Sequence, residues 1–100
     1  MRKKLVRDKI PGLIKKDGKV PTFRRAKKEE MTGLLFDKFI EEINEFLDEP
    51  SEEEAADILA VLEALCREHS ISLTRVLEVA ELKAREKGKF KKRYVLEDIK

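Results

Sequence analysis

The sequence predicts a small all-α protein, in which an antiparallel helical hairpin and a third helix form a bundle that oligomerisation completes. Apolar residues recur at three- and four-residue steps through most of residues 28–87, which is the helical period. Turn sequences break that pattern at DEPS (48–51) and HSIS (69–72). Charged residues make up 44% of the chain, far above the usual quarter or so, as is typical of soluble helix-rich proteins. One hundred residues suit a single domain, residues 1–100.

The first 28 residues are predicted to be irregular and strongly basic. Two prolines and two glycines interrupt them between residues 11 and 21, so we expect only a short turn or helix within residues 5–14, docked on the core. This segment carries 12 Lys/Arg and two Asp/Glu, or +10, whereas residues 29–81 carry −13 and residues 82–100 carry +5. Basic ends around an acidic centre can place cations beside a carboxylate cluster or a polyanionic ligand.

The hairpin is predicted from residues 28–48 and residues 51–69. Pro50 ends the first helix because proline donates no backbone hydrogen bond and disfavours helix at the preceding residue. Ser51 then suits the N-cap of the second helix. Between residues 55 and 66 this helix is apolar on almost every side, which exceeds what one small bundle buries. We therefore expect a homodimer, with a homotetramer as the alternative.

The third helix is predicted over residues 73–87. Ser72 suits its N-cap, and Gly88 stands where a left-handed C-terminal residue belongs. The tail that follows, KFKKRYVLEDI at 89–99, mixes apolar and basic residues. We expect it to form either a short strand, paired with residues 20–25, or an ordered arm.

Four carboxylates are predicted to meet on the hairpin. Glu42 and Glu45 lie one turn apart on the first helix, and Glu54 and Asp57 lie one turn apart on the second. Because a short turn joins the helices, they run antiparallel and the two pairs can face each other. Converging carboxylates need a counter-charge, above all Asp57, which lies among apolar residues. A hard divalent cation such as Mg²⁺ takes oxygen ligands, and its remaining positions suit phosphate oxygens.

The same acids also have a plainer interpretation. Glutamate is common on helix surfaces, so Glu42 and Glu45 alone would form a solvated face. Glu54 suits the capping box of Ser51. Asp57 is the hardest to explain in this way, because Asp is a poor helix former. The spacing alone leaves the metal site and the solvated surface equally open.

These motifs resemble a known family. EEINEF (41–46) and EEEAADILAVLEAL (52–65) are similar to the E-x-x-E…E-x-x-D signature of the MazG-like all-α nucleoside triphosphate pyrophosphohydrolases, to which phosphoribosyl-ATP pyrophosphohydrolase is related. The opening KLVRDKIPGLI (4–14) and the close KAREKGKFKKRYVLE (83–97) resemble a small single-domain branch with a VRDKIP-type N-terminus. The resemblance therefore covers nearly the whole chain.

The resemblance implies hydrolysis of a nucleoside triphosphate between its α and β phosphates, giving the monophosphate and pyrophosphate. The usual role in the family is house-cleaning, the removal of unwanted nucleotides. Mg²⁺ is implied as the cofactor, with Mn²⁺ as an alternative, and the implied ligands are Glu42, Glu45, Glu54 and Asp57. Glu41 would either support a ligand or orient the attacking water as a base.

Five cations are candidates for binding the triphosphate: Lys38, Arg7, Lys83, Arg85 and Arg93. Lys38 lies one turn before Glu42, so it can reach either the substrate or that glutamate. Arg7 and Asp8 are either residues of the site or a structural ion pair, and the sequence favours neither alternative. Lys83 and Arg85 have a second explanation, because cations are favourable near the end of a helix.

Other classes of protein are excluded or less favoured. No apolar run approaches the ~20 residues that span a bilayer, and the basic N-terminus lacks the apolar core of a signal peptide, so we expect a cytoplasmic protein. The single cysteine, Cys66, excludes an intramolecular disulfide. A nucleic-acid binder that uses the basic ends is the main rival, disfavoured because few aromatic residues accompany the cations. A non-enzymatic helical interaction module is the second rival.

Overall fold

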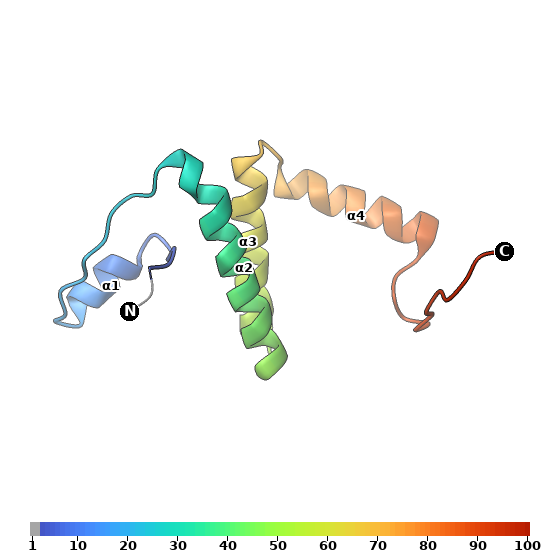
Figure 1. Cartoon of the computed structure of the whole chain (residues 1–100), viewed down its shortest axis with the longest axis horizontal. Helices are drawn as coiled ribbons and strands as arrows, with labels where there is room; N and C mark the ends of the chain where they lie inside the picture. The colour runs from blue at the N-terminus through green and yellow to red at the C-terminus, as the bar shows by residue number, and fades with distance from the viewer. Residues whose placement is uncertain (1–2) are drawn as a thin grey trace.

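The computed structural model describes residues 3–100, and every regular element in that range is helical. The elements are α1 (Ile10–Lys16), the 3-10 turn η1 (Lys28–Glu30), α2 (Met31–Asp48), α3 (Glu52–Glu68) and α4 (Leu73–Lys87). Figure 1 shows α2 and α3 side by side, with α1 on one side of them and α4 and the C-terminus on the other. The all-α prediction is confirmed, and the packing of α2 on α3 fits the predicted bundle.

The hairpin turn follows from its local sequence. Glu49 leaves the helical conformation (φ −143°, ψ 79°), as expected for the residue before Pro50. The hydroxyl of Ser51 then accepts a hydrogen bond of 3.1 Å from the backbone N–H of Glu54, which caps α3. Three glutamates in the first turn of α3 favour the positive end of the helix dipole. The turn is short enough that α3 returns along α2.

The core lies between α2 and α3 and is small. Among residues 3–100, the buried apolar residues are Leu35 on α2 with Val61 and Cys66 on α3. The prediction that a short N-terminal helix docks on this core is wrong for α1, which packs against none of the other helices that the structure describes and leaves Leu13 exposed. Its neighbouring residues reach the hairpin through charged side chains instead.

The turn between α3 and α4 sends α4 away from the hairpin. Ser70 has a left-handed backbone conformation (φ 57°), and the Ile71 N–H donates to the carbonyl of Cys66 at 2.8 Å. As a result α4 packs against α3 and not against α2, and it runs outward from their end (Figure 1). Leu77 and Leu82 on α4 are consequently exposed.

The tail after α4 is an extended arm. Gly88 ends α4 with φ 81°, a conformation that favours glycine. Residues 3–100 contain no strand, so the tail takes the second of its two predicted forms and does not pair with residues 20–25. Within the same range, none of the helices combines the length and the apolar character that crossing a bilayer requires.

Candidate metal centre

The faces of α2 and α3 that meet carry both the core and the acids. Leu35 and Glu42 are seven residues apart, about two helical turns, so the face of α2 that buries Leu35 also buries Glu42. On α3, Glu54 and Asp57 lie seven and four residues before the buried Val61 and share its face. Packing α3 back along α2 therefore sets Glu42 opposite Glu54 and Asp57.

Glu42, Glu54 and Asp57 form what we call the acidic cluster. One carboxylate oxygen from each lies within 4.8 Å of the other two. Oxygens on opposite sides of a Mg²⁺ ion are about 4.2 Å apart, so small side-chain rotations would bring this set to coordination distance. Three carboxylates also leave octahedral positions for water or phosphate oxygens. The donor set fits Mg²⁺, and the same hard oxygen ligands suit Mn²⁺.

Two oxygens of the acidic cluster are buried without a hydrogen-bond partner, Oε2 of Glu42 and Oε2 of Glu54. Glu42 is only 5% exposed. Buried polar atoms are nearly always paired, and leaving one unpaired costs free energy. Glu54 does not complete the capping box by bonding back to Ser51, so its carboxylate remains available to the cluster. A cation between the two oxygens would satisfy both.

The charge state of Glu42 reflects this crowding. Burial raises the pKa of Glu42, and the nearby carboxylate of Glu45 raises it further, while Lys38 opposes both. Glu45 thus lies beside Glu42, but it is exposed and does not belong to the three-residue group within 4.8 Å. Of the four predicted ligands, the structure brings three together and leaves Glu45 at the edge.

Lys38 and Glu41 lie directly next to the acidic cluster. The Nζ atom of Lys38 is 3.4 Å from Oε1 of Glu42 and 3.6 Å from Oε1 of Glu41. Lys4, which the sequence interpretation missed, approaches Glu41 at 3.2 Å. Burial raises the pKa of Glu41, but the hydrogen bond from Lys4 and the charges of Lys38 and Lys4 outweigh it, so the pKa lies below its ordinary value. Glu41 is therefore ionised at neutral pH.

Arg7 contacts the acidic cluster directly. Its Nη2 donates to Oδ1 of Asp57 at 2.6 Å, so its ion-pair partner is Asp57 and not its neighbour Asp8. The Arg7–Asp57 pair and the Lys4–Glu41 pair together attach the N-terminal segment to both α3 and α2. Both ion pairs are substantially exposed, and such pairs contribute only about 0–1 kcal/mol each. The segment is thus held weakly enough for Asp57 to exchange Arg7 for another cation.

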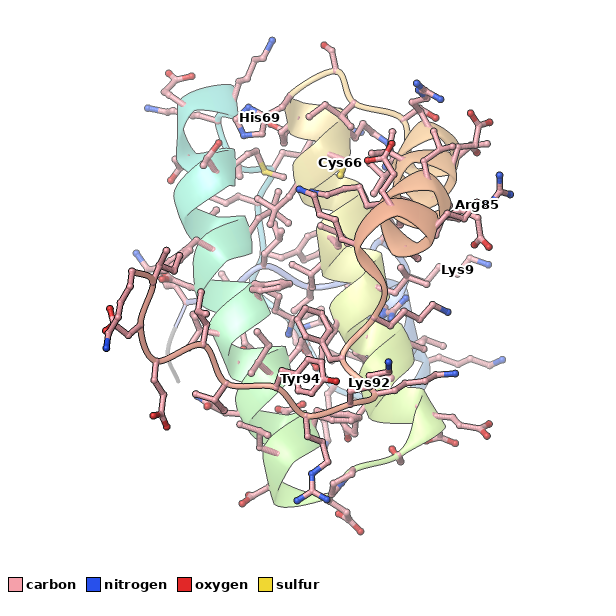
Figure 2. All side chains as sticks on the ribbon, turned by 90° about the vertical axis from the view of Figure 1, so that its right-hand side faces the viewer. Lys9, Cys66, His69, Arg85, Lys92 and Tyr94 are labelled. Carbon is pink, nitrogen blue, oxygen red and sulfur yellow. The ribbon has the colours of Figure 1, made fainter. Side chains whose placement is uncertain are left out.

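The other predicted cations lie elsewhere. Lys83 and Arg85 are on α4, and Arg93 is on the arm, which continues away from the hairpin. Figure 2 shows Arg85 on the side of α4 that points away from α2 and α3. Within residues 3–100, none of the three forms an ion pair with the acidic cluster. The physical reason is the outward course of α4, which sequence spacing does not encode.

No protein-family model, curated protein or solved structure matches this chain. The likeness of its motifs to the MazG-like superfamily therefore stays a prediction. The acidic cluster has to be interpreted from its own geometry and charge.

Proposed function

We propose that this chain is a Mg²⁺-dependent nucleoside triphosphate pyrophosphohydrolase of the MazG-like superfamily. The observation that carries the proposal is the buried carboxylate of Glu42, which has an unpaired oxygen and approaches the carboxylates of Glu54 and Asp57 across the hairpin. Folding three acids together is unfavourable unless a ligand compensates for it. A divalent cation does so, and phosphate oxygens complete its coordination.

In this proposal Glu42, Glu54 and Asp57 hold the metal, and Glu45 lies at its edge. When bound, Mg²⁺ neutralises phosphate charge and lowers the pKa of a bound water. Lys38 and Arg7 are the cations placed to contact the triphosphate, through charge-assisted hydrogen bonds.

Glu41 is the group best placed to orient the attacking water. It is ionised at neutral pH and lies beside the cluster, held by Lys4 and Lys38. The water oxygen bonds to the α-phosphorus, its proton passes to Glu41, and the bond from that phosphorus to the α–β bridging oxygen breaks. The bridging oxygen leaves with pyrophosphate, and the nucleoside monophosphate remains.

The test is product analysis with a panel of ribo- and deoxyribonucleoside triphosphates and Mg²⁺. The expected products are pyrophosphate and the monophosphate, with no free phosphate. Asp57→Asn should abolish turnover while circular dichroism shows unchanged helicity. Glu63→Gln is the matched control, because Glu63 is an exposed acid on α3 that pairs only with Arg67 among the described residues.

Turnover by Asp57→Asn near the rate of the unmodified chain would refute the assignment. The two rivals predict different results in a thermal-shift assay with Mg²⁺ and a non-hydrolysable nucleotide. A helical interaction module shows no stabilisation by either addition. A nucleic-acid binder shows instead an affinity for DNA or RNA that falls steeply with salt.

A further inference from the structure

The C-terminal arm, residues 89–100, exposes an unusual amount of apolar surface. Phe90 is 98% exposed and Tyr94 is 85% exposed, and Val95, Leu96 and Ile99 are also largely exposed to solvent. Figure 2 shows Tyr94 and Lys92 on this arm, beyond the end of α4. Monomeric soluble proteins rarely leave a contiguous apolar segment uncovered. The arm therefore lacks its packing partner in the single chain.

The whole chain has too much accessible surface for a monomer. Its accessible area is 9635 Å², whereas a folded monomer of 11.7 kDa exposes about 5,900 Å². Its radius of gyration is 17.7 Å, against about 13 Å for a compact domain of 100 residues. The excess of about 3,700 Å² per chain is ample for an obligate dimer, which buries about 2,000–5,000 Å² in total.

A groove on the outer face of α2 offers the complementary surface. It has a volume of about 660 Å³, and its apolar wall is formed by Leu34, Phe36 and Ile40. Glu41 and Glu45 lie along the same groove, beside the acidic cluster. An apolar groove with an acidic border suits a segment that carries both aromatic residues and cations.

The arm has that composition. It holds five Lys/Arg and two Asp/Glu, or +3, whereas residues 31–68 of the hairpin hold two Lys/Arg and 12 Asp/Glu, or −10. Opposite charges of this kind favour association and fix its orientation. Lys4 lines one edge of the groove, beside the N-terminal segment, whereas the arm follows the end of α4 on the other side of the hairpin (Figure 1). The apolar residues of the arm are 77–98% exposed, so the arm does not lie in the groove of its own chain. The arm of another copy is therefore the candidate to fill it.

We propose that the C-terminal arm of each chain lies in the α2 groove of a second copy, so that the two chains exchange their arms across a two-fold axis. The aromatic residues Phe90 and Tyr94 cover Phe36 and Ile40 of the partner copy. The cations between them, residues 91–93, then lie beside the acids of that groove. This arrangement gives Arg93 a route to the acidic cluster of the other chain, which its own chain does not provide.

The first test is the mass of the full chain in analytical ultracentrifugation at low and high salt. The expected species is a dimer whose dissociation constant rises with salt. The full-length variant Phe90→Ser/Tyr94→Ser/Leu96→Ser should raise that constant at least tenfold, with unchanged helicity. Val20→Ser is the matched control, since Val20 is equally exposed but lies outside the arm. A monomeric unmodified chain, or a dimer that the triple variant leaves intact, would overturn the proposal.

Charge reversal at Lys91, Lys92 and Arg93 provides a second variant with no apolar change. It should also weaken the dimer at least tenfold at low salt, and an unchanged dimer would contradict the docking of the arm on an acidic surface.

A third test identifies the contact itself. In a Cys66→Ala background, one chain carries Ile40→Cys and a differently tagged chain carries Tyr94→Cys. Mixing them under mild oxidation should give a covalent dimer of the two tags, and replacing Tyr94→Cys by Val20→Cys should abolish it. Equal cross-linking of Ile40→Cys to the Tyr94→Cys chain and to the Val20→Cys chain would show a contact without specificity and would refute the proposal. None of these readouts depends on catalysis, so they stand or fall separately from the proposed activity.

Discussion

Replacing Glu42 by Gln tests the physical argument for a metal centre without any assay of activity. The substitution keeps the shape of the side chain and removes one negative charge from the acidic cluster. Glu42 is the most informative position because it is buried and pairs with no residue of the N-terminal segment from residue 3 onward. In the metal-free protein, its charge is opposed by Glu45, Glu54 and Asp57 and favoured by Lys38. We expect the repulsion to prevail.

The distances give the expected size of the effect. Two charged carboxylate oxygens within 4.8 Å of each other repel by at least about 3.5 kcal/mol at an effective dielectric constant of about 20, so Glu54 and Asp57 together contribute about 7 kcal/mol. Lys38, 3.4 Å from Glu42, contributes about 5 kcal/mol of attraction on the same scale. The difference is about 2 kcal/mol, which the partial exposure of Asp57 reduces to about 1–2 kcal/mol. Glu42→Gln should therefore raise the metal-free Tm by at least about 4 °C.

Magnesium should narrow this difference in stability. At a concentration about ten times its Kd, Mg²⁺ stabilises the unmodified chain by about 1.4 kcal/mol, or about 6–11 °C in Tm for a chain of this size. The Glu42→Gln variant lacks one of three charged ligands and should gain less than half of that. The assay is thermal unfolding followed by circular dichroism at one fixed protein concentration, with EDTA or with Mg²⁺.

Glu63→Gln is the control, because it removes the same charge from an exposed site on α3. It should change stability by no more than about 0.5 kcal/mol and keep the full response to Mg²⁺. The reasoning fails if Glu42→Gln lowers the metal-free stability by about 3 kcal/mol or more, as the loss of a net favourable buried ion pair would. It also fails if both variants respond to Mg²⁺ as the unmodified chain does.

Three further outcomes follow from the same geometry. Arg7→Gln removes the 2.6 Å ion pair to Asp57 and should change metal-free stability by less than about 1 kcal/mol. It should raise the KM for the triphosphate about tenfold in steady-state kinetics, because a charge-assisted contact to phosphate is lost. An unchanged KM would leave Arg7 a purely structural role. The hydrogen bond from Arg24 lowers the pKa of Glu30 to about 2, so this pair stabilises the fold above the ordinary pKa and its contribution is lost as the pH falls towards 2. The difference in Tm between Arg24→Gln and the unmodified chain should then be present at pH 7 and vanish near pH 2, and a difference that grows in acid would contradict it. EDTA should abolish pyrophosphate release and excess Mg²⁺ restore it; release that persists in EDTA would exclude the metal-dependent reaction.

The helices could be predicted because local residues determine their ends. Pro50 and Ser51 act on the residues next to them, and Gly88 ends α4 by its own backbone freedom. The direction of α4 could not be predicted, since it depends on the left-handed conformation of Ser70, a residue that rarely adopts it. Without that direction, the sequence could not tell that α4 and the arm leave the hairpin uncovered.

The acidic cluster, like the fold, could be predicted in part. The convergence of Glu42 with Glu54 and Asp57 follows from helical spacing and a short turn, both readable in the sequence. Glu45 was predicted as a fourth ligand because it lies one turn from Glu42, the same spacing that unites Glu54 and Asp57 in the cluster. The spacing does not show that Glu45 remains exposed beside Glu42 and outside the three-residue group. Lys4 was not identifiable, since one cation among twelve in the first 28 residues carries no signal of which acid it will meet.

The segregation of charge along the chain gives these features a common physical origin. A hairpin with a net charge of −10 is destabilised by self-repulsion, because closing it brings like charges closer together. The N-terminal segment relieves part of this repulsion through Lys4 and Arg7, at the surface of the cluster. Neither residue bonds to the buried oxygens of Glu42 and Glu54, which have no hydrogen-bond partner among the described residues. The outer face of α2 carries both acids and apolar residues. In our proposal, the basic arm of another copy neutralises these acids and covers these apolar residues.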